Sequence, residues 1–156
     1  MSEMSKDLAL FILRLSGAGL AYAHGWSKVQ GLAAGESSRF IEGVANLGFP
    51  APTFFAWAAA LTEFGGGLLI ALGLLSRFVA PVAAFNMFVA AFLRHKAHLH
   101  LLNALGIQSV PEETLKQSGN PEMALLYLAC FLAIFLLGPG RFALDQLLGR
   151  ASKGKR

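Results

Sequence analysis

Four long apolar segments constrain what this chain can fold into more than any other feature of its sequence. A helix rises about 1.5 Å per residue, so about 20 residues cross the ~30 Å hydrocarbon core of a bilayer. Only 14% of the 156 residues are charged, whereas a typical soluble domain has about 25%. The sequence therefore predicts an all-α fold, an integral membrane four-helix bundle that forms one domain over residues 1–156. The predicted spans cover approximately residues 8–24, 54–75, 77–95 and 121–138.

A soluble bundle with very apolar helices is the alternative, and the size of the chain argues against it. The apolar fraction is 55% and the mean hydropathy is +0.56. Small domains bury the smallest fraction of their surface, so a short soluble chain could not hide this much apolar area. The same composition excludes intrinsic disorder. The net charge of +4 does not indicate nucleic-acid binding, because the basic residues lie mainly at the chain ends and in predicted loops.

The distribution of basic residues indicates how the spans are oriented. Four spans place both termini on one side, and the cytoplasmic side is expected to hold more Lys and Arg. The side with the termini carries seven such residues: Lys6, Arg77, Arg141, Arg150, Lys153, Lys155 and Arg156. The other side carries five: Lys28, Arg39, Arg94, Lys96 and Lys116. The bias predicts cytoplasmic termini, and the basic tail over residues 141–156 is interpreted as a topology anchor attracted to anionic headgroups.

The first apolar segment has two interpretations. The sequence Ala-Tyr-Ala at residues 21–23 resembles a signal-peptide cleavage site. Against cleavage, Glu3 and Asp7 make the start of the chain acidic, and Arg14 interrupts the apolar run. We therefore expect a retained helix.

Two long connections on the side opposite the termini contain short helical patterns. In residues 94–120, the sequence at 111–113 predicts a helix start, and 119–121 predicts a turn before the fourth span. By contrast, the link at residues 76–77 is tight, so the second and third spans form an antiparallel hairpin. The connection over residues 25–53 carries apolar residues on one helical face, which predicts a short interfacial helix: Phe40, Ile41, Val44 and Leu47.

Arg14 and Glu63 are the only charged residues well inside a predicted span. A charge at this depth is costly and usually faces a partner or a cavity. Arg14 lies ten residues from the outer end of its span, about 15 Å, and Glu63 lies nine residues from the outer start of its span, about 13 Å. Similar depths on antiparallel helices predict an ion pair between them. The pair either locks two helices together or belongs to a ligand site.

Small residues surround Glu63 on its own helix face and allow another backbone to approach closely. Asn86 lies near the same depth on the third span, and Tyr127 lies on the fourth. This arrangement indicates one polar layer inside the bundle, with tight helix packing and a bound quinone-like ligand as the two interpretations. The candidate ligand-binding residues are Arg14, Glu63, Gly66, Gly67, Asn86 and Tyr127.

The four histidines lie on the outer side of the predicted spans. Metal binding needs three or four convergent ligands, and haem in a helix bundle requires histidines deep within the spans. We therefore predict neither a metal nor a haem at these residues: His24, His95, His98 and His100. The single cysteine, Cys130, allows neither an intrachain disulfide nor a CxxC pair.

Four stretches of the sequence resemble the DoxX family of small membrane proteins. The loop motif of Gly25, Lys28 and Gly31 is similar to a G-x-x-K-x-x-G stretch after the first helix of that family. Residues 47–52, Leu-Gly-Phe-Pro-Ala-Pro, resemble its proline turn. Residues 63–77 resemble its E-x-x-G-G-x-x-L-x-x-G-L-x-T-R core, with Ser76 in place of Thr. Residues 138–145 resemble its closing G-P-G-x-x-S-x-D, with Ala143 in place of Ser.

The resemblance implies a multi-pass protein of the bacterial inner membrane with no covalently bound cofactor. Relatives are linked to quinone-coupled oxidation and to membrane oxidoreductase complexes, which leaves two hypotheses open. In the first, the chain is a small subunit or partner of a quinone-linked redox system that responds to oxidative, thiol or quinone stress, with a possible quinone near Glu63. In the second, it is a non-catalytic anchor or scaffold for an extracytoplasmic redox enzyme. Expected partners are the lipid bilayer and a redox protein or a second copy, but no nucleic acid.

Overall fold

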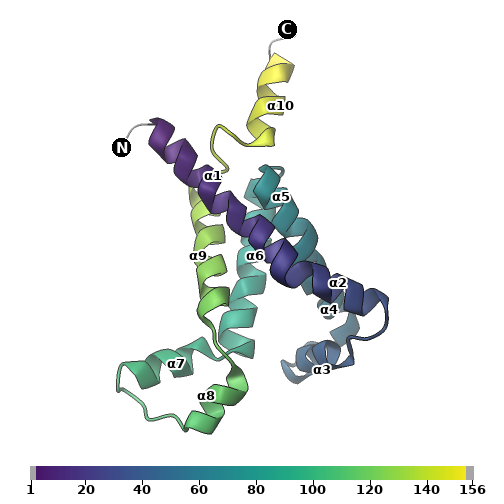
Figure 1. Ribbon diagram of the computed structural model, residues 1–156, viewed down its shortest axis with the longest axis vertical. Coiled ribbons are helices and arrows are strands. Elements are labelled where there is room, and N and C mark those ends of the chain that lie inside the picture. The colour runs from purple at the N-terminus through teal and green to yellow at the C-terminus, as the bar shows by residue number, and fades with distance from the viewer. Residues whose placement is uncertain (1–2, 154–156) are drawn as a thin grey trace.

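The computed structural model describes residues 3–153, with side chains through Leu148, and every regular element in this part is a helix (Figure 1). The all-α prediction is therefore confirmed for the described residues. Lys155 and Arg156 of the predicted basic tail lie outside them. The α-helices are α1 (Glu3–Leu20), α2 (Trp26–Ala33), α3 (Ser38–Asn46), α4 (Pro52–Leu61), α5 (Gly67–Leu72), α6 (Ser76–Phe88), α7 (Ala97–Ala104), α8 (Glu112–Ser118), α9 (Glu122–Leu137) and α10 (Leu144–Lys153). The π-helical segments are η1 (Ala21–Gly25), η2 (Thr62–Gly66) and η3 (Val89–Arg94).

Three continuous helices are long and apolar enough to cross a membrane. They run over Glu3–Ala33, Pro52–Leu72 and Ser76–Arg94, with 31, 21 and 19 residues. The first continues nine residues beyond the predicted end at residue 24, because η1 joins α1 to α2 without a break. A fourth candidate span requires α8 and α9 to be taken together as one broken helix. The axes of these two helices differ by 54°.

The helices have two distinct ends (Figure 1). The end with the start of α1, the α5–α6 turn and α10 is called the terminal end, and the end with α3, α7 and α8 is called the loop end. The most extensive packing joins α6 to α9, and α1 packs along α5. Large apolar side chains such as Phe78, Phe85 and Leu136 point outward, as expected of helices that face lipid. The buried core between the helices includes Leu20, Ile70, Ala83, Met87, Phe131 and Ile134.

The first two candidate spans touch backbone to backbone at Gly17 and Gly67. A Cβ atom added to either glycine would lie 2.5 Å from the carbonyl oxygen of the other. Such closeness is possible only without side chains, which is why small residues occur where membrane helices cross. This contact fixes the register between α1 and α5.

Short helices cover the loop end, as the sequence indicates. The predicted interfacial helix is α3, which packs through Val44, Phe40 and Ile41 against α2 and α4. The predicted helix start at residues 111–113 is also confirmed, because α8 begins at Glu112.

Two histidines bind the last residue of α8, Ser118. His95 donates from Nδ1 to the Ser118 carbonyl at 2.7 Å. The Ser118 hydroxyl donates to the Leu115 carbonyl, so His100 donates from Nε2 to that hydroxyl at 2.9 Å. These two side chains hold α8 against the end of the third candidate span.

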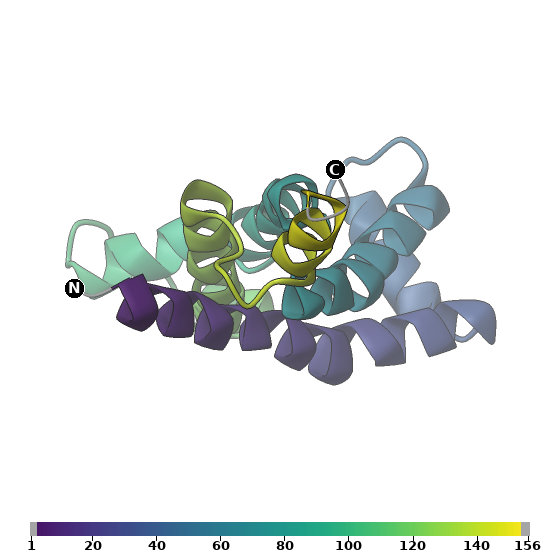
Figure 2. The same ribbon diagram turned by 90° about the horizontal axis from the view of Figure 1, so that it is seen from above.

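The tight turn between α5 and α6 anchors the segment that follows α9. The turn is closed by Gly73 with φ +73° and Leu75 with φ 51°, which confirms the predicted hairpin. Asp145 donates its backbone N–H to the Gly73 carbonyl at 3.1 Å, and its Oδ2 accepts from the Ser76 N–H at 3.4 Å. Seen from above in Figure 2, the connection between α9 and α10 passes over α1, where Arg141 N–H donates to Asp7 at 2.9 Å.

Candidate functional site: a buried carboxylate cluster

Glu63 is the centre of a charged cluster built from three candidate spans. Its side chain is buried, with 4% of the residue exposed. Lys28 of α2 donates from Nζ to both carboxylate oxygens at 2.6 Å, and Asn86 of α6 donates from Nδ2 to Oε1 at 3.4 Å. The ammonium neutralises the carboxylate, and the amide provides a second donor. We refer to Lys28, Glu63 and Asn86 as the carboxylate cluster.

The π-helical segments position this cluster. Glu63 lies in η2, η1 ends three residues before Lys28, and η3 begins three residues after Asn86. A π-turn inserts an extra residue into a helix, redirects the side chains that follow, and occurs frequently at functional sites. The η1 and η2 segments touch closely, since a Cβ on Gly25 would lie 2.6 Å from the Phe64 Cα. This contact brings α2 near enough for Lys28 to reach Glu63.

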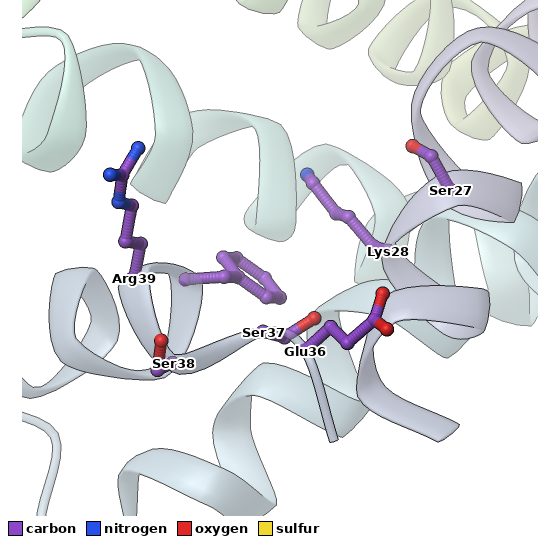
Figure 3. Close-up of a pocket in the computed structure, with 7 residues that line it drawn as sticks. Ser27, Lys28, Glu36, Ser37, Ser38 and Arg39 are labelled. Atoms are coloured by element: carbon purple, nitrogen blue, oxygen red, sulfur yellow. The ribbon is translucent and has the colours of Figure 1, made fainter. Parts of the chain in front are cut away.

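Lys28 connects the buried carboxylate to the surface of the loop end. Its side chain is 31% exposed, and Nζ lies 5.2 Å from the centre of the Phe40 ring. Figure 3 shows Lys28 on the wall of an open pocket of about 420 Å³, which is also lined by Ser27 and Arg39. Of the carboxylate cluster, Lys28 is the residue that lines this pocket.

The structure places Tyr127 beside the cluster rather than in hydrogen-bond contact with it. Its ring stacks on Phe131 at 6.0 Å and meets the His24 ring edge-on at 6.2 Å. A Cβ on Gly19 would lie 3.3 Å from its hydroxyl oxygen. Tyr127 and His24 thus form an aromatic layer between α9 and the first candidate span.

The candidate glycines lie in helix contacts. Gly66 packs on Val79 of α6, and Gly67 packs on Gly17. The prediction that Gly25, Lys28 and Gly31 belong to a loop is wrong. All three residues lie within the first long helix. Gly31 leaves room for the Ser37 hydroxyl, which lies 2.6 Å from the position a Cβ would take.

The predicted ion pair between Arg14 and Glu63 is wrong. The carboxylate binds Lys28 instead, and Arg14 makes no ion pair within the described residues. The contacts of Gly17 with Gly67 and of Gly25 with Phe64 place Arg14 beside Gly73. Gly73 lies ten residues beyond Glu63, about 15 Å along the helix. Measured from the loop end, Arg14 lies deeper than predicted because the first helix continues to Ala33 and crosses the second at Gly17 and Gly67.

Arg14 occupies a separate buried position near the terminal end. Only 1% of the residue is exposed, and its Nε has no hydrogen-bond partner. The guanidinium lies 5.5 Å from the centre of the Phe11 ring. One of its terminal nitrogens takes the space that a side chain at Gly73 would need.

The sequence contains a signal for the role of Lys28. Asp7, Arg14, Ala21 and Lys28 recur every seven residues, so they share one face of a continuous helix. That face is buried at Asp7, Arg14 and Ala21. The series therefore indicates that the first helix continues past residue 24, but the π-turn of η1 shifts the spacing between Ala21 and Lys28, so the series alone does not place Lys28 opposite Glu63.

The separation of Arg14 from Glu63 predicts additive mutational effects. Residues without shared partners change stability independently, to within about 0.5 kcal/mol. In Arg14→Gln/Glu63→Gln, the loss in free energy of unfolding should therefore equal the sum of the two single losses. Thermal unfolding in mild detergent measures all three variants. Recovery in the double variant would contradict this geometry and support a direct pair.

No three His, Cys, Asp or Glu side chains of the described residues are grouped so that they could hold a metal ion. The cluster has two hydrogen-bond donors, Lys28 and Asn86, and one carboxylate acceptor, Glu63.

These features define a class, a small membrane protein that is helical throughout its described residues and has a buried glutamate paired with a partly exposed lysine between its candidate spans. The sequence pattern of the DoxX family matches residues 9–96, a range that includes the whole carboxylate cluster. The chain belongs to the DoxX family, as its motifs predict.

Two relatives extend the match. The chain is 29% identical over 145 residues to the inner membrane protein YqjF of Escherichia coli, covering 93% of this chain and 95% of that protein. It is 35% identical over 108 residues to the uncharacterized membrane protein Rv3486 of Mycobacterium tuberculosis, covering 67% of this chain and 62% of that protein. No solved structure matches the chain.

Proposed function

We propose that this protein binds a quinone headgroup at the carboxylate cluster, as a small subunit or partner of a quinone-linked redox system in the bacterial inner membrane. The observation that carries the proposal is the buried Glu63 carboxylate, which receives hydrogen bonds from Lys28 and Asn86. Ionisable residues inside membrane spans are costly and characteristically mark ligand or proton pathways. The neighbouring open pocket gives such a site an entrance.

The topology we propose is a four-helix bundle with α9 as the fourth span and both termini in the cytoplasm. The close packing of α9 on α6 and the outward-facing Leu126 and Leu136 support a span. The larger number of basic residues at the terminal end supports the orientation. The name of YqjF, an inner membrane protein, supports the location.

The residues of the cluster match the requirements of a quinone headgroup. The Lys28 ammonium and the Asn86 amide can donate hydrogen bonds to carbonyl oxygens, and the Glu63 carboxylate can accept one beside them. A quinone supplies two-electron, two-proton chemistry when bound. With one cysteine, the chain has no dithiol pair to deliver two electrons, so a protein partner supplies them. Lys28 can turn from Glu63 toward a ligand because it remains partly exposed.

A fluorescence titration tests the site. The Trp26 ring is tilted against the Phe64 ring, with 5.3 Å between ring centres, and Phe64 follows Glu63. Decylubiquinone added to the purified protein should quench Trp26 saturably, and Trp26→Phe should lose that signal. Because a hydrogen bond is removed, Asn86→Ala and Lys28→Met should each raise Kd about tenfold. Lys116→Met is the matched control, because its partner Glu112 is exposed and distant from the cluster. Unsaturable quenching that is equal in all variants would contradict quinone binding.

The scaffold role is the second candidate, and the loop end favours it. Three large apolar side chains are exposed in α7 and just after its last residue: Leu101, Leu105 and Ile107. They offer an apolar surface to an extracytoplasmic redox protein. Isolation of the protein in mild detergent separates the two functions. A copurifying redox protein that is lost in Leu105→Glu, with no extractable quinone, would favour the scaffold.

A further inference from the structure

The terminal end contains buried polar groups that have no partner within the described chain. Three buried side-chain atoms of the described residues accept or donate no hydrogen bond: Asp7 Oδ2, Arg14 Nε and Ser76 Oγ. All three lie at this end, because Arg14 contacts Gly73, three residues before Ser76, and Asp7 binds the connection between α9 and α10. Unpaired polar atoms are rare and costly in a protein interior, so their occurrence together indicates a partner from outside the chain.

The charge of Arg14 has no acidic partner. All nine Asp and Glu residues of the chain lie in the part whose side chains the structure describes, and none of them forms an ion pair with Arg14. The two acids that bind the connection between α9 and α10 are engaged elsewhere. Asp7 accepts from the Arg141 N–H, and Asp145 accepts from the Ser76 N–H. An uncompensated buried charge is strongly destabilising, so Arg14 requires an anion that the acidic side chains of this protein do not supply.

Arg14 and Ser76 lie at the two ends of the tight turn between α5 and α6. A terminal nitrogen of Arg14 takes the position of a Cβ on Gly73, and the Ala143 Cα lies 2.7 Å from that same position. At the other end of the turn, Asp145 binds Ser76. The segment over residues 138–145, here called the strap, therefore covers both donors. Arg14 is 1% exposed and Ser76 is fully buried.

This turn lies where a bilayer presents phosphate groups. The second candidate span ends at Leu72 and the third begins at Ser76, so the turn marks the membrane boundary of the terminal end. Basic side chains border it, with Arg77 and Arg141 exposed and Lys6 partly exposed. Positive charge raises the local concentration of anions. A guanidinium and a hydroxyl are donors that match the oxygens of a phosphate group.

We propose that Arg14 and Ser76 bind a phosphate group beneath the strap. The guanidinium donates to phosphate oxygens and has its charge compensated, and the Ser76 hydroxyl donates to a further oxygen. The Phe11 ring covers one face of the guanidinium at 5.5 Å and meets the Phe142 ring edge-on at 6.4 Å. Because Phe11 and Phe142 are 39% and 48% exposed, these rings can turn aside without disturbing the core, which gives the ligand an entrance.

The phosphate group has two sources, a phospholipid headgroup and a soluble phosphate compound, and the experiment below distinguishes them. The proposal is independent of quinone binding, since it uses none of the residues of the carboxylate cluster.

Thermal unfolding of the full chain in a phosphate-free detergent tests the site. In one arm, inorganic phosphate is titrated at constant ionic strength against sodium chloride. In the other arm, dihexanoylphosphatidylglycerol is titrated below its micelle concentration. A ligand that binds only the folded state raises the unfolding temperature as its concentration rises, so the unaltered protein should be stabilised saturably in at least one arm. A response to inorganic phosphate assigns the site to a soluble phosphate compound, and a response to the lipid alone assigns it to a headgroup.

Variants make the test specific. Arg14→Gln should raise the Kd of the stabilising compound at least about tenfold, and Ser76→Ala about fivefold, because each removes a donor to the phosphate. Arg14→Lys keeps the charge but loses the planar fork and should have an intermediate Kd. Arg77→Gln is the matched control, because it removes the same charge from an exposed side chain next to Ser76. Its Kd should stay within about twofold of that of the unaltered protein.

Two results would overturn the proposal. The first is an equal response in the unaltered protein, Arg14→Lys and Ser76→Ala, which would be a general effect of the added salt or lipid. The second is no response in either arm, which would leave buried water as the partner of the unpaired donors. If Arg14→Gln does not fold, the comparison of Arg14→Lys and Ser76→Ala with Arg77→Gln decides between these outcomes.

Discussion

Lys28→Met is expected to lower the free energy of unfolding in mild detergent by about 2–3 kcal/mol, because it strands the Glu63 carboxylate among buried helices. The carboxylate loses the ammonium at 2.6 Å and keeps only the weaker Asn86 bond at 3.4 Å. This loss is at or below the lower limit of the ~3–5 kcal/mol typical of a broken buried pair, because the Lys28 side chain is 31% exposed. Thermal or denaturant unfolding followed by circular dichroism measures the loss.

The two partners should respond unequally to mutation. Glu63→Gln should cost less than Lys28→Met, because a partly exposed lysine can turn toward water and a glutamine side chain is neutral. The double variant should recover to about the stability of Glu63→Gln. Lys116→Met breaks an exposed pair at 2.9 Å and should change stability by less than about 0.5 kcal/mol. Purely additive losses at Lys28 and Glu63 would contradict the pairing.

The sequence predicts the helices of this protein well because hydrophobic patterning and turn residues are local properties. The tight turn before Ser76 and the helix that starts at Glu112 both follow from residues close in sequence. The amphipathic pattern that becomes α3 is local in the same sense. Each prediction depended on no more than about two helical turns of sequence.

The partner of Glu63 could not be predicted in the same way, because it depends on how two helices cross. Hydropathy places Arg14 and Glu63 inside spans but does not give the register between them. That register depends on the Gly17–Gly67 contact and on π-turns that disrupt the regular spacing of side chains. A register error of a few helical turns is enough to predict Arg14 as the partner of the carboxylate, whereas the observed partner is Lys28.

The glycine crossing therefore gives the second large prediction. Gly67→Ala is expected to lower the free energy of unfolding by about 3 kcal/mol or more, since overpacking of a close contact forces backbone shifts. The new Cβ would lie 2.5 Å from the Gly17 carbonyl oxygen and 3.2 Å from the Ala21 Cβ. The nearest of these atoms belongs to backbone, which cannot turn aside as a side chain can. The helices would have to separate, and the contact that aligns Lys28 with Glu63 would loosen with them.

The triplet of glycines supplies a matched control for this prediction. Gly65 is two residues away in the same sequence, and a Cβ there would meet no atom within 4 Å. Alanine favours helix over glycine by about 1 kcal/mol, so Gly65→Ala should leave stability unchanged or raise it. Gly17→Ala would place a Cβ 2.5 Å from the Gly67 carbonyl oxygen, so it overpacks the same crossing from the opposite helix and should match Gly67→Ala. If Gly67→Ala instead unfolded at the same temperature as Gly65→Ala, the first two helices could not cross at these glycines, and the register that brings Lys28 to Glu63 would be wrong as well.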